Sequence, residues 1–179
     1  RLAVENGVDL VLELPATFSL RSAEFFARGA INILKATGCI TNLSCGVENP
    51  TTNFVELAKI VSSIDFKNAL QKFLDEGLPY AAAYEKALQI LANTSKLNTP
   101  NDILALEYSK ALQGTNITPL FIQREAANYN DENIEGTIAS ATAIRKAFLE
   151  KNALSLQKAV PKNVWQALEN HQAINEKLL

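Results

Sequence analysis

The sequence predicts an α/β protein in which a parallel sheet carries helices on its faces. Short runs of strand-forming residues occur at 8–14, 41–46 and 118–123, and long stretches with apolar residues at helical spacing lie between them. Parallel strands need crossovers of this length, whereas antiparallel strands can be joined by tight turns. With 179 residues, the chain is long enough to bury a core of its own.

Each predicted strand has a local reason. Residues 8–14 follow the turn signal Asn6-Gly7 and end at Pro15, so we expect a largely buried parallel strand there. Residues 41–46 form a short second strand that runs into Gly46, and residues 118–123 contain the apolar run of a third.

The predicted helices fill the rest of the chain. One begins after Ser22 and ends at Thr37-Gly38. Apolar stripes predict four more at 54–61, 66–74, 80–91 and 103–112, with turn-prone residues between them. Further helices begin near Ser140 and near Val160-Pro161.

Composition and charge exclude several classes of protein. The net charge of −2 argues against a domain that grips nucleic acid by bulk electrostatics, and the basic run from Arg145 to Lys162 is best interpreted as a solvated helix face. No apolar run has the length of a membrane span, and the sequence does not begin with a secretory signal, so we expect a cytoplasmic protein without membrane contact. Two cysteines without a neighbouring histidine indicate neither a disulfide framework nor a zinc site.

The stretch Ser140–Lys146 combines a helix start with groups that suit a phosphate. The first amides of a helix lack intrahelical acceptors, so Ser140 or Thr142 can cap them, or an anion can accept from them. Arg145 lies one turn further on, and its guanidinium can hold two phosphate oxygens at once. Most stretches of this kind are ordinary capped helices in which the arginine is solvated.

Ligands of parallel sheets bind at the carboxyl ends of the strands. Glu13 and Pro15 follow the first predicted strand, Gly46 ends the second, and Arg124 follows the third. Each position has a simpler alternative: Gly46 as a turn glycine, Arg124 as a surface partner of Glu125, and Asn101 in the next helix start as a cap. Three carboxylates could act as acid or base, although nothing in the sequence pairs them: Glu13, Glu24 and Glu48. His171 is the one histidine, so no nucleophile pair of the Ser-His type is indicated.

Four stretches in order resemble the bacterial tRNA(Met) cytidine acetate ligases. They are Gly7–Pro15, Ser22–Ala30, Pro100–Ala105 and Ile138–Lys146. The resemblance implies a Rossmann-like nucleotidyltransferase core of the HIGH-motif type, with a parallel sheet and a helical insertion. It also implies an enzyme that uses ATP, with Mg²⁺, to convert acetate to acetyl-adenylate. The acetyl group would then pass to N4 of the wobble cytidine of elongator tRNA(Met).

The resemblance also implies site residues and boundaries. Its ATP contacts correspond here to Gly46, Asn101, Arg124, Ser140, Thr142 and Arg145, with Arg145 in the catalytic role and no metal ligand named. Residues 1–150 would form the nucleotide-binding core, with a helical insertion at about 53–114, and residues 151–179 would start a C-terminal helical region.

The sequence departs from the family's pattern in several places. The family's N-terminal strand and its Asn-Pro-Phe-His-x-Gly-His segment do not occur in these 179 residues, so we expect the chain by itself to be a catalytically incomplete fragment. Asp102 stands where the family often has Asn, and Asn130 where it often has His. Two alternatives stay open: a nucleotidyltransferase that adenylylates a small phosphorylated substrate, and a noncatalytic nucleotide- or RNA-binding domain. The sequence leaves the oligomeric state open.

Overall fold

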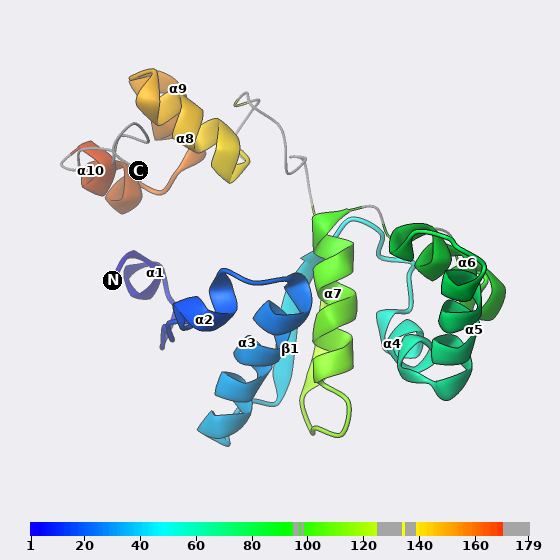
Figure 1. The fold of residues 1–179 in the computed structure, drawn as a ribbon. Coiled ribbons are helices and arrows are strands. Elements are labelled where there is room, and N and C mark those ends of the chain that lie inside the picture. The colour runs from blue at the N-terminus through cyan, green and yellow to red at the C-terminus, as the bar shows by residue number, and fades with distance from the viewer. Residues whose placement is uncertain (95–96, 98, 125–133, 135–138, 170–179) are drawn as a thin grey trace. The chain divides into compact units, whose positions relative to one another are not determined.

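The structure, a computed structural model, describes residues 1–94, 97, 99–124, 134 and 139–169. The chain divides into two compact units, which Figure 1 draws together without fixing their relative position. Residues Glu13–Arg124 form what we call the sheet unit, and Arg1–Leu12 with Glu125–Leu179 form the terminal unit. The predicted boundary at residue 150 remains a prediction.

In the described part of the chain, two parallel strands form the sheet: β1 (Asn42–Val47) and β2 (Thr118–Gln123). Gly46 lies opposite Ile122 and Val47 opposite Gln123, so both strands end at one edge. This confirms the second and third predicted strands and their parallel pairing. Because side chains alternate along a strand, one face carries the partly buried Leu43 and the fully buried Val47, whereas Ile122 on the other face is 60% exposed.

The predicted strand at residues 8–14 is wrong. These residues have no regular secondary structure, and Leu10 is 65% exposed. A strand exists only where a neighbouring strand pairs with its amides and carbonyls. The sheet of the described residues contains β1 and β2, and neither pairs with this run. Glu13 and Pro15 are therefore not at a strand end.

The described residues of the sheet unit form six helices. Ser22 precedes α3, and Gly38 ends it in the left-handed conformation (φ 71°), as predicted. The four predicted helices between the strands are confirmed with small shifts at their ends, and α2 is additional. Their bounds are α2 (Ala16–Ser19), α3 (Ala23–Thr37), α4 (Phe54–Ser62), α5 (Ile64–Asp75), α6 (Tyr80–Ala92) and α7 (Pro100–Ala111).

Helix α7 lies beside β1 and separates two cores, with α3 on one side and the α4–α6 group on the other (Figure 1). Phe54, Phe66 and Leu88 are fully buried in the larger core, together with Val47 from β1 and Leu106 from α7. Ile31, Leu112 and Ile117 form the smaller core with side chains of α3 and β1. Most of the packing of the sheet unit therefore depends on α7.

The terminal unit is helical. Helices α8 (Ala141–Leu149) and α10 (Lys162–Glu169) confirm the predicted helix starts near Ser140 and Val160-Pro161. Helices α1 (Leu2–Glu5) and α9 (Ala153–Ala159) were not predicted. Asn6 donates a side-chain hydrogen bond of 3.3 Å to Asn163, which joins α1 to α10. His171, Asn130 and most of the predicted loop at 132–138 lie outside the described residues.

No helix in the described part of the chain combines the length and the apolar character needed to cross a bilayer.

Truncation of a single core ring tests this packing. Phe54 is fully buried, and its ring centroid lies 4.9 Å from that of Phe121 on β2. Phe54→Ala should lower the free energy of unfolding by about 3–5 kcal/mol, because it leaves a cavity between α4 and the sheet. The matched control is Val55→Ala, because Val55 is the next residue of the same helix and 41% exposed. Urea denaturation of both variants measures the effect, and equal losses would contradict the assigned core.

Candidate functional site

The first turn of α7 is attached to the end of β1 by the carboxylate of Asp102. Its Oδ1 accepts hydrogen bonds from the backbone amides of Glu48 at 2.9 Å and Asn49 at 3.3 Å. Asp102 is only 4% exposed, and buried carboxylates are retained where such donors offset the loss of water. Thr99 caps the helix, with its Oγ1 accepting from the amide of Asp102 at 3.4 Å. Asp102 thus fixes where α7 begins relative to β1.

This attachment brings together three of the predicted site residues around Glu48. Asn101 donates its side-chain amide to Glu48 Oε1 at 2.5 Å, and Arg124 Nε lies 3.6 Å from the same oxygen. The amide of Arg124 donates to the carbonyl of Val47 at 2.9 Å, which places this arginine at the end of β2. We call Gly46, Glu48, Asn101 and Arg124 the Glu48 cluster.

Gly46 contributes to the cluster by having no side chain. A Cβ atom at this position would lie 3.0 Å from Arg124 Cγ, closer than ordinary van der Waals contact. The absent side chain leaves room for the stem of the Arg124 side chain against the end of β1.

One oxygen of the cluster has no partner. Glu48 Oε2 is buried and accepts no hydrogen bond from the described residues. An unsatisfied buried acceptor costs about 1–3 kcal/mol, so such an atom calls for a physical explanation. A ligand that brings hydroxyl or amine donors to this oxygen would remove the cost.

The sequence predicted that Gly46 and Arg124 share an edge of the sheet, and the family resemblance implied Asn101. Two of the simpler alternatives are wrong: Asn101 is not the cap of α7, and Gly46 lies inside β1 rather than in a turn. The alternative partner of Arg124, Glu125, is outside the described residues. Reasoning from the sequence did not assign Glu48 as the centre, although its place directly after a strand was a usable signal.

The other three predicted site residues form a group of their own at the start of α8, in the terminal unit. Ser140 caps the helix, its Oγ accepting from the amide of Ala143 at 2.9 Å. Arg145 is exposed and reaches back along the helix to donate through Nη2 to Thr142 Oγ1 at 3.3 Å. The guanidinium is thereby held near the amides of the first turn, where an anion is favoured.

The donor set of the Glu48 cluster fits a nucleotide better than a resident metal. It offers a guanidinium for phosphate oxygens, and an amide and a carboxylate oxygen for hydroxyl or amine groups. Among the residues that the structure describes, no three His, Cys, Asp or Glu side chains lie together as metal ligands.

Comparisons with known proteins agree with this chemistry. A model of the HIGH Nucleotidyl Transferase family matches residues 1–178. The tRNA(Met) cytidine acetate ligase of Clostridium novyi is 40% identical over 169 residues, which cover 89% of this chain and 42% of that protein. The enzyme of the same name from Leuconostoc mesenteroides is 42% identical, with 94% and 43% covered. The chain thus spans less than half the length of these relatives.

Two crystal structures of Thermotoga maritima TmcAL share the fold. The apo form matches with a TM-score of 0.84 at 31% identity, over 94% of this chain and 43% of that chain. The form bound with alpha-thio ATP matches with a TM-score of 0.80 at 30% identity, over 94% and 42%. Together with the family match over almost every residue, these similarities establish that the chain belongs to the HIGH nucleotidyl transferase family.

Proposed function

We propose that the protein containing this chain activates acetate with ATP and transfers the acetyl group to N4 of the wobble cytidine in elongator tRNA(Met). An acetate oxygen attacks the α-phosphorus of ATP, which forms acetyl-adenylate and releases diphosphate. The N4 amine then attacks the acetyl carbonyl, loses a proton and releases AMP. The observation that carries the proposal is the Glu48 cluster at the strand ends, in a fold shared with a protein crystallised with an ATP analogue.

In this proposal the Glu48 cluster binds ATP. The free nitrogens of the Arg124 guanidinium hold phosphate oxygens, while its Nε stays beside Glu48. Glu48 Oε2 accepts from a ribose hydroxyl, which would satisfy the buried oxygen. Gly46 leaves the room that the Arg124 side chain needs in this position. Asn101 keeps Glu48 in place through its hydrogen bond.

The start of α8 supplies the charge stabilisation that adenylation needs. Negative charge develops on the leaving diphosphate in the transition state, and a preorganised guanidinium beside helix amides stabilises such charge. Arg145 therefore has the catalytic role, with Thr142 orienting its guanidinium and Ser140 fixing the helix start. Mg²⁺ is expected to enter with the triphosphate, because this ion keeps most of its ligands from phosphate and water and needs no cage of protein ligands.

Exchange of labelled diphosphate into ATP tests the role of Arg145. In the complete protein, Arg145→Ala should lower acetate-dependent exchange by at least about 100-fold, the usual loss when one preorganised donor is removed. Arg145→Lys should recover only part of it, because an ammonium lacks the fork geometry. Lys158→Ala, which removes an exposed cation from α9, is the control. Acetate-independent exchange, or equal rates in all variants, would contradict the proposal.

Loss of the Glu48 charge tests the centre of the cluster. Glu48→Gln should weaken ATP binding on the order of tenfold, because a ribose hydroxyl would then donate to a neutral amide oxygen, and a hydrogen bond to a charged group contributes about 1–1.5 kcal/mol more than one between neutral groups. Isothermal titration calorimetry measures the dissociation constant. Glu56→Gln, at an exposed glutamate of α4, should bind ATP like the unchanged protein. A Glu48→Gln protein with unchanged affinity would remove Glu48 from the site.

A methyl group at Gly46 tests whether ATP binding depends on the position of the Arg124 side chain. Gly46→Ala should weaken ATP binding by about tenfold while the thermal unfolding midpoint changes little. The new Cβ meets Arg124 Cγ, which belongs to a flexible side chain that can move aside and leave its binding position. The control is Ala36→Gly in α3, outside the cluster, which should lower the stability and leave the ATP affinity unchanged. A strong loss of stability without loss of ATP affinity would contradict this account.

A further inference from the structure

Asp102 and Glu48 take part in a closed ring of hydrogen bonds at the edge of the sheet. The Asp102 carboxylate accepts from the backbone amide of Glu48 at 2.9 Å, and the Glu48 carboxylate accepts from the side-chain amide of Asn101 at 2.5 Å. Because Asn101 and Asp102 are consecutive residues, the two hydrogen bonds and the chain between them form a ring. Each bond of such a ring holds the groups of the other in place. Loss of one bond should therefore loosen the other.

One oxygen of Asp102 makes both contacts with the end of β1. Oδ1 accepts from the amides of Glu48 and Asn49, whereas no residue in the described part of the chain donates to Oδ2. A neutral carbonyl oxygen in the same place could accept both bonds, because it has two lone pairs. The ring therefore requires an acceptor at one position, and it does not require the negative charge of the carboxylate.

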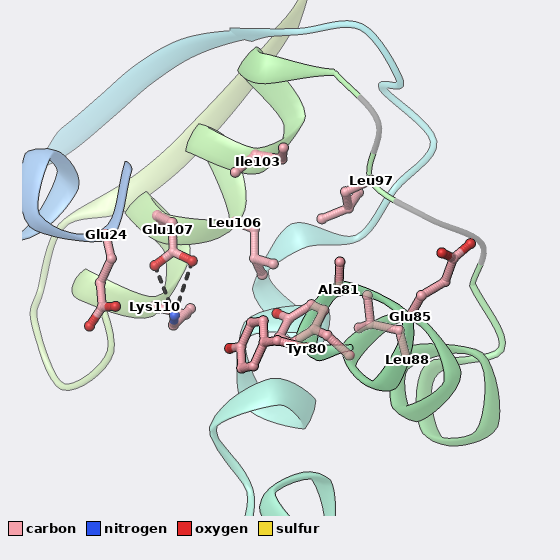
Figure 2. Close-up of a pocket in the computed structure, with 11 residues that line it drawn as sticks. Glu24, Tyr80, Ala81, Glu85, Leu88, Leu97, Ile103, Leu106, Glu107 and Lys110 are labelled. Carbon is pink, nitrogen blue, oxygen red and sulfur yellow. Dashed lines mark hydrogen bonds and ion pairs between the residues drawn. The ribbon is translucent and has the colours of Figure 1, made fainter. Parts of the chain in front are cut away.

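Side-chain packing supports the first turn of α7 less than its middle. On the side toward α6, helix α7 borders a recess of about 350 Å³, lined by Ile103 and Leu106 of α7 and by Tyr80 of α6 (Figure 2). Ile103, the residue after Asp102, is 39% exposed, whereas Leu106 is 3% exposed and belongs to the larger core. Side chains that border a recess lose the contacts that would otherwise hold them. The polar bonds of Asp102 are therefore the contacts that position the start of the helix.

We propose that Asp102 is a positioning residue for ATP binding, and that it acts through the position of one oxygen and not through its charge. The ring holds Glu48 Oε1 beside Asn101 and so aims the buried Oε2 at the ribose hydroxyl. Asp102 itself makes no contact with the nucleotide. This inference rests on the proposed function, in which the Glu48 cluster binds ATP, and it adds a residue outside the cluster on which the affinity depends.

Two substitutions of Asp102 in the complete protein separate position from charge. Asp102→Asn keeps an acceptor oxygen in place and removes the charge, so the dissociation constant for ATP should stay within about twofold of that of the unchanged protein. Asp102→Glu keeps the charge but moves the carboxylate by about one bond length. It should weaken ATP binding at least about tenfold, because binding groups must be held within about 0.5 Å of their positions. Isothermal titration calorimetry measures both constants.

Thr99→Ala is the matched control for a general loosening of the helix start. It removes the cap of α7, whose Oγ1 accepts from the amide of Asp102 at 3.4 Å, and leaves the carboxylate in place. We expect a lower thermal unfolding midpoint, and an ATP dissociation constant within about twofold of that of the unchanged protein. In diphosphate exchange, Asp102→Glu should raise the KM for ATP with little change in kcat, because the ring affects binding and Arg145 stabilises the transition state.

Three results would overturn the proposal. Loss of ATP affinity in Asp102→Asn with affinity kept in Asp102→Glu would assign the effect to the charge. Unchanged affinity in Asp102→Glu would show that the site does not need the ring. An equal loss of affinity in Thr99→Ala would leave Asp102 as an ordinary stabiliser of the helix start. If Asp102→Glu does not fold, Asp102→Ala removes the acceptor without added volume, and the same loss is expected of it.

Failure of the proposed function gives a different pattern, because ATP binding is measured without acetate or tRNA. A protein that shows the expected order of ATP affinities but no acetate-dependent exchange loses the ligase chemistry and keeps the role of Asp102. A protein that exchanges diphosphate in response to acetate, with equal KM values for ATP in all variants, keeps the proposed function and loses this inference.

Discussion

The attachment of α7 to β1 through Asp102 is the interaction on which the candidate site depends. Two backbone amides at the end of β1, which the sheet leaves without partners, donate to one buried carboxylate oxygen. Each part satisfies the other: without Asp102 the two part-buried amides would lose their acceptor, and without the amides the carboxylate would be a buried charge. This mutual requirement fixes the position of α7, and with it Asn101 relative to Glu48.

Helix α7 then connects the candidate site to the core of the sheet unit. Its first turn contributes to the Glu48 cluster, and its buried side chains join the larger core. The family's chemistry needs an activated nucleotide and an acceptor in defined positions, and preorganisation of this kind lowers the entropic cost of bringing them together. A helix packed on both sides provides such positions, whereas a surface loop would not.

Part of this arrangement could be predicted from local signals in the sequence. The bounds of α3 follow from Ser22 and Gly38, and the parallel pairing of β1 and β2 follows from the helical length between them. The sequence also predicted that Gly46 and Arg124 would share an edge. Residues 8–14 show the limit, because an apolar run with strand propensity does not reveal whether another strand is present to pair with it.

The remaining features depend on distant contacts. Asn101 and Glu48 are 53 positions apart, and the hydrogen bond between them exists only because α7 docks at the end of β1. Asp102 is the residue that makes the docking possible, yet by its sequence it resembles an ordinary acidic residue in the first turn of a helix. The helix and strand propensities of residues, and the spacing of apolar residues, do not show which distant residues will be in contact.

The central claim is that ATP binds at the Glu48 cluster, and an NMR titration of the protein with a nonhydrolysable ATP analogue tests it most directly. The account predicts that the backbone amide resonances of Gly46, Glu48, Asn101 and Arg124 shift together and saturate with one dissociation constant. Amides of α5, which contributes no residue to the cluster, should remain unchanged. Saturable shifts confined to other elements, with these four amides unmoved, would contradict the assignment of the site.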